Sequence, residues 1–230
     1  MATRFLDGIS NTSSTSTLAD VGSLDPTKYH VYFNDFDTYV LGDWTITTKE
    51  DGAGSATEAL DDADGGVLLV TNAGGDDDND FFNKKGESFT LESGKKAWFR
   101  SRFKVSNATG SDFVIGLQQT DTSPLSVNNG VYFQKDDGDT NLDFKSSNGG
   151  ATLAASALAT VADDTYVTVG FYHAGGTEIQ YFSDNVKRGS LEVETTYLPT
   201  TELTVSFGLQ NGTTSARTMS VDYIFAAKER

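Results

Sequence analysis

The chain has 230 residues and no cysteine, and its 17 Lys and Arg face 33 Asp and Glu, a formal net charge of −16 at pH 7. This charge argues against nucleic-acid binding, which depends on Lys and Arg to displace counterions, and the lack of cysteine excludes disulfide scaffolds, thiolate metal sites and cysteine nucleophiles. Aromatic residues make up 11% of the chain, which is enough to build a hydrophobic core and argues against overall disorder.

Residues 1–30 differ in composition from the rest of the chain. Residues 11–17 read NTSSTST, a polar run without apolar periodicity, and both a flexible tail and an arm that orders against a partner fit it. The anchors of such an arm would be Arg4, Phe5, Leu6, Ile9 and Leu18. The first residues lack a signal-peptide pattern, and no apolar run approaches the ~20 residues of a membrane span. We therefore expect a protein made in a cytoplasm, without a membrane partner.

Residues 31–230 show the period-two alternation of β-strands, and a chain of this length fits one all-β domain. Turn residues at 136–139 and 174–176 predict two hairpins, whereas Ala151–Ala162 fits a short helix, a strand or a loop. No long amphipathic helix alternates with the strands, so the pattern predicts an all-β fold, a two-sheet antiparallel β-sandwich with an extended N-terminal arm. The predicted strands are Tyr32–Phe36, Val67–Thr71, Trp98–Val105, Phe113–Gln118, Val131–Lys135, Leu142–Lys145, Tyr166–His173, Glu178–Phe182, Leu203–Leu209 and Thr218–Phe225.

Two tetrapeptides echo each other, Ile115–Gln118 (IGLQ) and Phe207–Gln210 (FGLQ). Each places a glycine in the middle of a predicted strand, where it permits a close approach of a neighbouring backbone. Two copies do not make a repeat protein, so we interpret them as two strands in similar environments.

One loop concentrates carboxylates: residues 74–80 read GGDDDND and contain Asp76, Asp77, Asp78 and Asp80. Calcium takes 6–8 oxygen ligands, and such a loop can supply several of them. The EF-hand template fails, because the loop has no Gly at its sixth position and no Glu at its twelfth. We expect a solvated acidic turn and no cofactor, with a calcium site as the alternative.

The sequence carries no recognisable catalytic set. It lacks a G-x-S-x-G elbow, a phosphate-binding loop and the E-x-D-x-x-E pattern of laminarinase-type glycosidases. Glu192 and Glu194 are the one tight glutamate pair with i, i+2 spacing, and we expect them to be solvated. Trp44 and Trp98 are candidates for stacking on a sugar, although their apolar surroundings favour burial in a core.

Three parts of the predicted domain share a pattern of strands and turns: Phe33–Phe36 followed by Trp44, Tyr166–Phe171 with the Gly175–Gly176 turn and Ile179–Asp184, and Ser220–Ile224. In this order they resemble the concanavalin A-like (laminin G-like) lectin and glucanase sandwich. This resemblance spans about residues 30–226 and implies a jelly roll of two antiparallel sheets. The metal-binding and glycosidase residues of that family find no matching positions here, so none is carried over.

The N-terminal sequence MATRFLDGISN, its Ser/Thr stretch and the following LDPTKYHVYFNDFD resemble virion structural proteins of tailed bacteriophages. This resemblance implies a non-enzymatic capsid decoration protein, a homotrimer on the capsid surface. Its residues 1–30 would contact the major capsid protein or another virion protein, and residues 31–230 would form the sandwich. Two other functions stay open: a lectin-like carbohydrate-binding module and a glycoside hydrolase.

Overall fold

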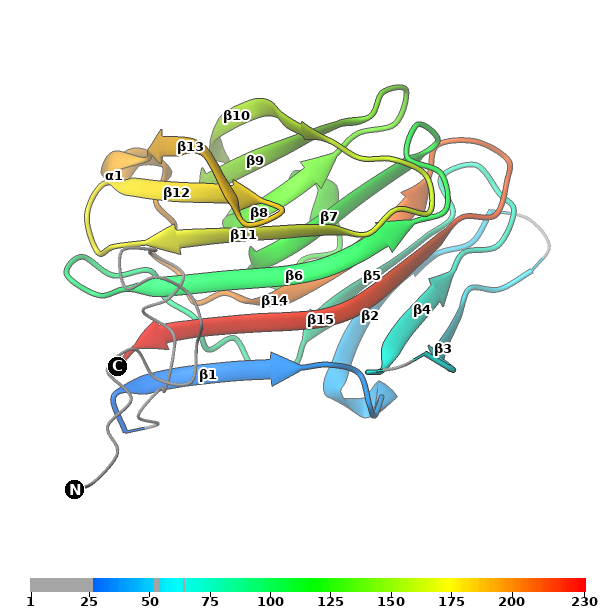
Figure 1. The fold of residues 1–230 in the computed structure, drawn as a ribbon, viewed down its shortest axis with the longest axis horizontal. Coiled ribbons are helices and arrows are strands. Elements are labelled where there is room, and N and C mark those ends of the chain that lie inside the picture. Colours follow the sequence, from blue (N-terminus) through cyan, green and yellow to red (C-terminus); the bar gives the residue numbers. More distant parts are fainter. Residues whose placement is uncertain (1–26, 52–53, 64) are drawn as a thin grey trace, which may run out of the picture.

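The computed structural model describes residues 27–51, 54–63 and 65–230, which form two antiparallel sheets packed face to face (Figure 1). This arrangement confirms the predicted all-β sandwich. The strands of sheet A are, in spatial order, β13 (Val186–Glu192), β12 (Glu178–Ser183), β11 (Val167–His173), β6 (Ala97–Val105), β15 (Thr218–Glu229), β4 (Val67–Thr71) and β3 (Thr57–Asp61), with β1 (Tyr29–Asn34) paired to the C-terminal half of β15. The strands of sheet B are β10 (Ala151–Thr160), β9 (Asn141–Asn148), β8 (Gly130–Lys135), β7 (Ser111–Gln118), β14 (Thr204–Asn211), β5 (Asn79–Lys84) and β2 (Trp44–Lys49).

Alternation along each strand decides which side chains fill the space between the sheets. On β6, Phe99, Phe103 and Val105 pack in this core, whereas the intervening Arg100 and Arg102 point to the outer side of sheet A. Successive side chains of a strand point to opposite faces, so the sequence pattern alone fixes this division. The prediction for this strand is confirmed.

Aromatic rings close the core beneath β2, β5 and β14. Phe82 and Phe207 are stacked with ring centroids 4.8 Å apart, and Trp44 meets Phe207 edge-on at 5.3 Å. All three side chains are buried. Such aromatic pairs hold neighbouring strands in one register and therefore fix the outer face of sheet B as well.

The short helices lie in loops between strands. They are η2 (Leu41–Asp43), η3 (Pro124–Ser126) and α1 (Glu194–Tyr197). Among the residues that the structure describes, none of the helices is long and apolar enough to cross a membrane.

The segment that the sequence left open, Ala151–Ala162, forms strand β10. Its pairing with β9 shifts register between Ala155 and Ala159, and Ala157 in between has a φ of 54°. The amide of Ala157 donates a hydrogen bond of 2.8 Å to Oδ1 of Asp143, which satisfies the backbone group that the irregularity frees. A tertiary contact thus holds an alanine-rich segment in a strand.

The ten predicted strands are all present, with ends displaced by a few residues. The first one, β1, begins at Tyr29, inside the range assigned to the arm, and pairs with β15 through Asn34. The hairpins at 136–139 and 174–176 are also present, joining β8 to β9 and β11 to β12. The proposed anchors Arg4, Phe5, Leu6, Ile9 and Leu18 lie outside the described residues. Strands that the sequence did not predict are β2, β3, β5 and β13.

Candidate functional site

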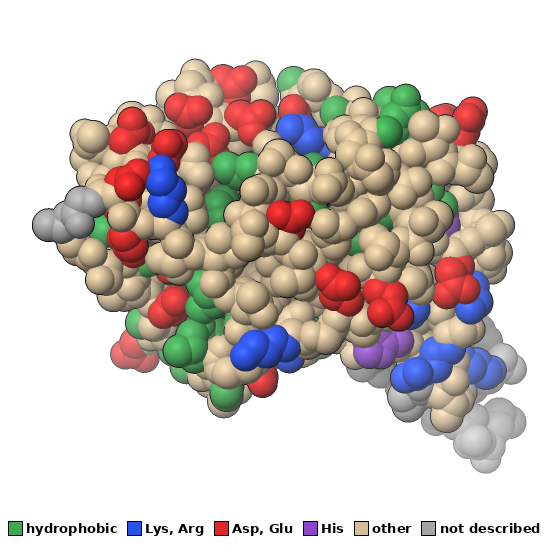
Figure 2. Space-filling view, turned by 180° about the vertical axis from the view of Figure 1, so that it is seen from behind, with side chains coloured by type: hydrophobic (Ala, Val, Ile, Leu, Met, Phe, Trp, Pro, Cys, Tyr) green, Lys and Arg blue, Asp and Glu red, His purple; other side chains and the backbone are tan. Residues whose placement is uncertain are grey.

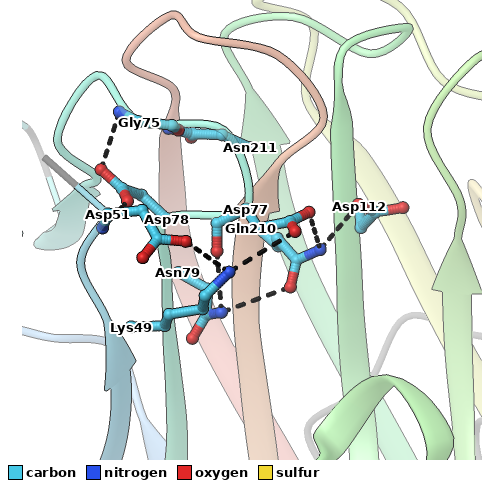
Figure 3. Close-up of polar contacts among 9 residues, drawn as sticks. All are labelled: Lys49, Asp51, Gly75, Asp77, Asp78, Asn79, Asp112, Gln210 and Asn211. Carbon is cyan, nitrogen blue, oxygen red and sulfur yellow. Dashed lines mark hydrogen bonds and ion pairs between the residues drawn. The ribbon is translucent and has the colours of Figure 1, made fainter.

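Four polar side chains form a line across the outer face of sheet B, near one end of its central strands (Figure 3). Asn79 of β5 lies opposite Lys49 of β2 on one side and opposite Gln210 of β14 on the other. Gln210 in turn lies opposite Asp112 of β7. We call these four residues the polar row. Neighbouring strands are ~4.8 Å apart, so the row presents hydrogen-bonding groups at regular intervals.

Hydrogen bonds tie the polar row together. The side-chain amide of Asn79 donates to Oε1 of Gln210 at 3.3 Å. Nε2 of Gln210 lies 3.1 Å from Oδ1 of Asp77 and 3.5 Å from Oδ2 of Asp112, so one amide contacts two carboxylates. At the other end, Nζ of Lys49 lies 2.6 Å from Asp51 and 3.5 Å from Asp77. The row is therefore held in place before any ligand arrives.

Asp112 is the buried carboxylate of the polar row, with 7% of its surface exposed. Burial raises the pKa of Asp112, and the charges of Asp137 and Asp136 raise it further. A hydrogen bond of 2.7 Å from the backbone amide of Asp137 and the nearby Lys135 act in the opposite direction. Asp112 thus holds a proton more readily than an exposed aspartate does.

A loop covers the middle of the same face, next to the polar row. Residues 119–129 join β7 to β8, and their Leu125 and Val127 pack on Phe81, Val114 and Tyr132 of the sheet. The side-chain amide of Gln118 donates to the backbone carbonyl of Pro124 at 2.9 Å and holds the loop down. Between this loop and the polar row lies a hollow of about 220 Å³, lined by Asn79, Gln210, Phe81 and residues 122–126.

The two echoing tetrapeptides lie on adjacent strands, β7 and β14, as similar environments would require. Neither Gly116 nor Gly208 places a side chain on the outer face of sheet B. A Cβ on Gly116 would come within 2.5 Å of the Cα of Tyr132, and one on Gly208 within 2.6 Å of the Cα of Phe81. The glutamine that ends each tetrapeptide lies on this same face. Gln118 holds the loop 119–129 in place, and Gln210 belongs to the polar row.

The four aspartates of the acidic loop point in different directions. Asp76 is exposed, and Asp77 reaches toward Gln210. Both carboxylate oxygens of Asp78 accept backbone amides, from Asp51 and from Gly75, and so close the loop. Asp80 lies on the inner side of β5. No three His, Cys, Asp or Glu side chains of the described ranges converge in the way that a metal site requires.

The other candidates from the sequence lie apart from the polar row. Glu192 ends β13 and Glu194 begins α1, and both are exposed. Trp44 is 4% exposed in the core, and Trp98 is 1% exposed on the outer side of sheet A, against Tyr172. Neither indole ring is open to solvent.

Sequence reasoning missed all four members of the polar row. Asn79 lay in the acidic loop as the sequence was interpreted, and Lys49 lies on a strand that was not predicted. The repeated glutamine of the two tetrapeptides was the one available signal. It could not reveal the row, because β2, β5, β7 and β14 are distant in sequence and their order in the sheet is a tertiary property.

The surface around the row is acidic. Figure 2 shows the molecule from the side of sheet B, where acidic side chains are spread over a mostly uncharged surface. The exposed Asp77 and Asp51 lie beside the polar row and contribute to this surface. A ligand rich in hydroxyl groups fits these acceptors better than an anionic ligand does.

No protein-family model matches the chain, and no curated protein matches it either. Solved structures do. A glycoside hydrolase family 16 endo-glucanase from Bacteroides ovatus is 16% identical with a TM-score of 0.62, over 85% of this chain and 99% of that one. An endo-1,3-β-glucanase from Streptomyces sioyaensis is 13% identical with a TM-score of 0.61, over 90% and 98%. An endo-β-1,4-glucuronan lyase from Trichoderma reesei is 12% identical with a TM-score of 0.55, over 85% and 94%.

These structures contradict the predicted function. We expected a non-enzymatic decoration protein of a bacteriophage capsid, yet all three are carbohydrate-cleaving enzymes and none is a virion protein. The prediction of a virion protein without enzymatic activity is therefore wrong. It relied on the N-terminal resemblance, most of which lies outside the described residues. At this level of identity the likeness shows the fold, and the chain has the concanavalin A-like sandwich of these glucanases.

Proposed function

We propose that the chain binds a neutral polysaccharide across the outer face of sheet B, with the polar row as the hydrogen-bonding edge of the site. The observation that carries this proposal is the alignment of an ammonium group, two amides and a carboxylate on four adjacent strands beside an open hollow. A polysaccharide presents hydroxyl groups at a regular repeat, and a sheet presents side chains at a regular repeat as well.

The chemistry of the row suits sugar hydroxyls. An amide offers two donors and an acceptor, and a carboxylate offers acceptors alone, so Asn79, Gln210 and Asp112 together serve both roles of a hydroxyl. The hollow beside the row is lined by the half-buried Leu125, which supplies the apolar contact that a sugar ring needs. The enzymes that share the fold act on glucans and a glucuronan, which supports a carbohydrate ligand.

Calorimetric titration with oligosaccharides of mixed-linkage β-glucan and of 1,3-β-glucan tests this proposal. We expect saturable binding that Gln210→Ala and Asn79→Ala each weaken by about fivefold, since each removes hydrogen bonding worth about 1 kcal/mol. Gln180→Ala is the matched control, because Gln180 lies half-buried on the opposite sheet, on β12. Absence of heat with both sugars, or equal losses in all three variants, would overturn the proposal.

A second candidate function is cleavage of the bound glycan, because two carboxylates contact the same nitrogen of Gln210. Oδ1 of Asp77 and Oδ2 of Asp112 contact the same nitrogen of Gln210 at 3.1 and 3.5 Å, so the sum of these distances limits their separation. That limit covers the ~5–5.5 Å of retaining glycosidases and reaches the ~6.5 Å at which inverting ones begin. Asp112, with its raised pKa, would protonate the glycosidic oxygen, and Asp77 would act as the second carboxylate.

Release of reducing ends from the same oligosaccharides distinguishes cleavage from binding. If Asp112 is the acid, Asp112→Asn abolishes release and leaves binding measurable by calorimetry. Asp62→Asn, an exposed aspartate on the loop between β3 and β4, is the control and keeps full activity. Binding without release in the unchanged protein would limit the function to recognition.

A further inference from the structure

A second hollow, of about 190 Å³, opens at the far end of the strands that carry the polar row. It lies between β1, the end of β5 with the residues that follow it, and the start of β14. Asn79 and Lys84 are the first and last residues of β5, so the two hollows lie roughly 17 Å apart along this strand. They are separate places on the surface.

Basic groups line this second hollow, although the chain as a whole is acidic. His30, Lys84 and Lys85 contribute side chains to its wall, together with the hydroxyl residues Ser88 and Thr204. Figure 2 shows Lys and Arg side chains gathered beside a His at one lower corner of the molecule. In a chain with a net charge of −16, such a cluster of basic side chains is not expected from the overall composition.

The charges of Arg230 and Lys228 act on His30, which lines the hollow. Burial lowers the pKa of His30, and the charges of Arg230 and Lys228 lower it further. Nearby carboxylates balance this cluster in part. A carboxylate oxygen of Asp43 lies 3.9 Å from Nζ of Lys84, and hydrogen bonds from Lys95 and Thr90, with a smaller effect of the charge of Lys228, lower the pKa of Glu92. Lys85 is exposed, and no carboxylate within the described ranges forms an ion pair with it.

We propose that this hollow binds an oxyanion, a phosphate, sulfate or carboxylate group, held by Lys84, Lys85 and the ring of His30. Ammonium and imidazolium groups donate charge-assisted hydrogen bonds to such oxygens. Nε2 of His30 lies 3.0 Å from the hydroxyl of Ser88, and both residues line the hollow. A bound anion would offset the mutual repulsion of the lysines. The site is independent of the glycan-binding proposal.

The pH titration of the His30 ring by NMR tests the proposal, with inorganic phosphate and D-glucuronate as probes at constant ionic strength maintained with chloride. Phosphate should shift the His30 signals saturably and raise the pKa of His30 by about 1, because a nearby opposite charge favours the protonated ring. His173, the second histidine, is buried elsewhere and reports on the intact fold. An unchanged His30 titration with both probes would overturn the proposal.

Two variants locate the anion. Lys84→Met and Lys85→Met should each weaken phosphate binding at least about tenfold, whereas Lys187→Met on β13 should leave it unchanged. Saturation by phosphate alone identifies a small inorganic ion, and saturation by glucuronate as well identifies the carboxylate of an acidic sugar. Equal affinity in the Lys85→Met variant and the unchanged protein would contradict the assignment.

Discussion

The hydroxyl of Thr48 donates a hydrogen bond of 2.5 Å to Oδ1 of Asp80, on the inner side of sheet B. Asp80 is 1% exposed, and burial raises its pKa to about 6. The hydrogen bond from Thr48 lowers this pKa, and the nearby Glu58 and Glu50 raise it. A charged carboxylate that is buried beside two other acids lowers the free energy of unfolding at neutral pH.

Asp80→Asn should therefore stabilise the protein at neutral pH. The pKa of Asp80 is about 6 in the folded state and 3.8 in the unfolded chain, so the folded state binds this proton more tightly. The loss of unfolding free energy caused by the charged carboxylate is therefore complete above about pH 6 and disappears as the pH falls toward 4. We expect the variant to gain about 1–3 kcal/mol in unfolding free energy at pH 7.5 and almost nothing at pH 4. Urea denaturation at both pH values measures this, with exposed Asp62→Asn as the control. An equal gain at both pH values would contradict the explanation.

Lys135 predicts the opposite dependence at alkaline pH. Its side chain points into the core with 1% exposure, and Nζ donates to the backbone carbonyl of Asp139 at 3.1 Å. Burial lowers the pKa of Lys135, which Asp112 and other nearby acids raise in part. The folded state releases this proton at a pH below ~10.4, the pKa of a lysine in the unfolded chain. The free energy of unfolding should therefore rise with pH between the folded-state and the unfolded-state pKa. Relative to Lys135→Met, the unchanged protein should gain at least about 0.5 kcal/mol between pH 7 and 10.

Comparison with this variant isolates the lysine, because the tyrosines that titrate in the same range are present in both proteins. Chemical denaturation at pH 7, 8.5 and 10 gives the three differences. If the free-energy difference between the two proteins stays constant with pH, Lys135 does not change its charge on unfolding in this range.

His173 should make the fold sensitive to mild acid. The ring is fully buried, Nε2 lies 2.9 Å from the carbonyl of Gly176 in the β11–β12 hairpin, and burial lowers the pKa. Because the pKa of His173 is lower in the folded state than in the unfolded chain, stability falls as the pH drops below ~6.5, the pKa of the unfolded chain's histidine. His173→Gln keeps a donor for Gly176 and should flatten the melting temperature between pH 7.5 and 5. The pKa of His30 is lowered too, so His30→Gln measures its separate share.

The strands that could be predicted from the sequence are those whose alternation is strong and local. Trp98–Val105 is polar at every second position from Arg100 to Lys104, and the strand forms over this range. β5 was missed because its polar outer residues, Asn79 and Asn83, extend the appearance of the acidic loop. β10 stayed ambiguous because the contact with Asp143 that decides it comes from another strand.

The candidate site was less predictable than the fold for a related reason. Each residue of the polar row looks like an ordinary surface residue in its own segment. The row exists because β14 lies between β5 and β7, so that Gln210 meets both Asn79 and Asp112. Sequence alternation fixes the face on which a side chain lies, and only the strand order fixes its neighbours.

Gly208 tests whether close backbone approach maintains the outer face of sheet B. Its φ is 153°, and a Cβ there would lie 2.6 Å from the Cα of Phe81 and closer still to the carbonyl of Asp80. Because backbone atoms cannot move aside cheaply, Gly208→Ala should cost at least about 2–3 kcal/mol of unfolding free energy. Gly42→Ala is the matched control, since a Cβ there meets nothing within 4 Å, and it should stay within about 0.5 kcal/mol. Equal denaturation midpoints for the two variants would show that β5 and β14 can separate to admit a side chain.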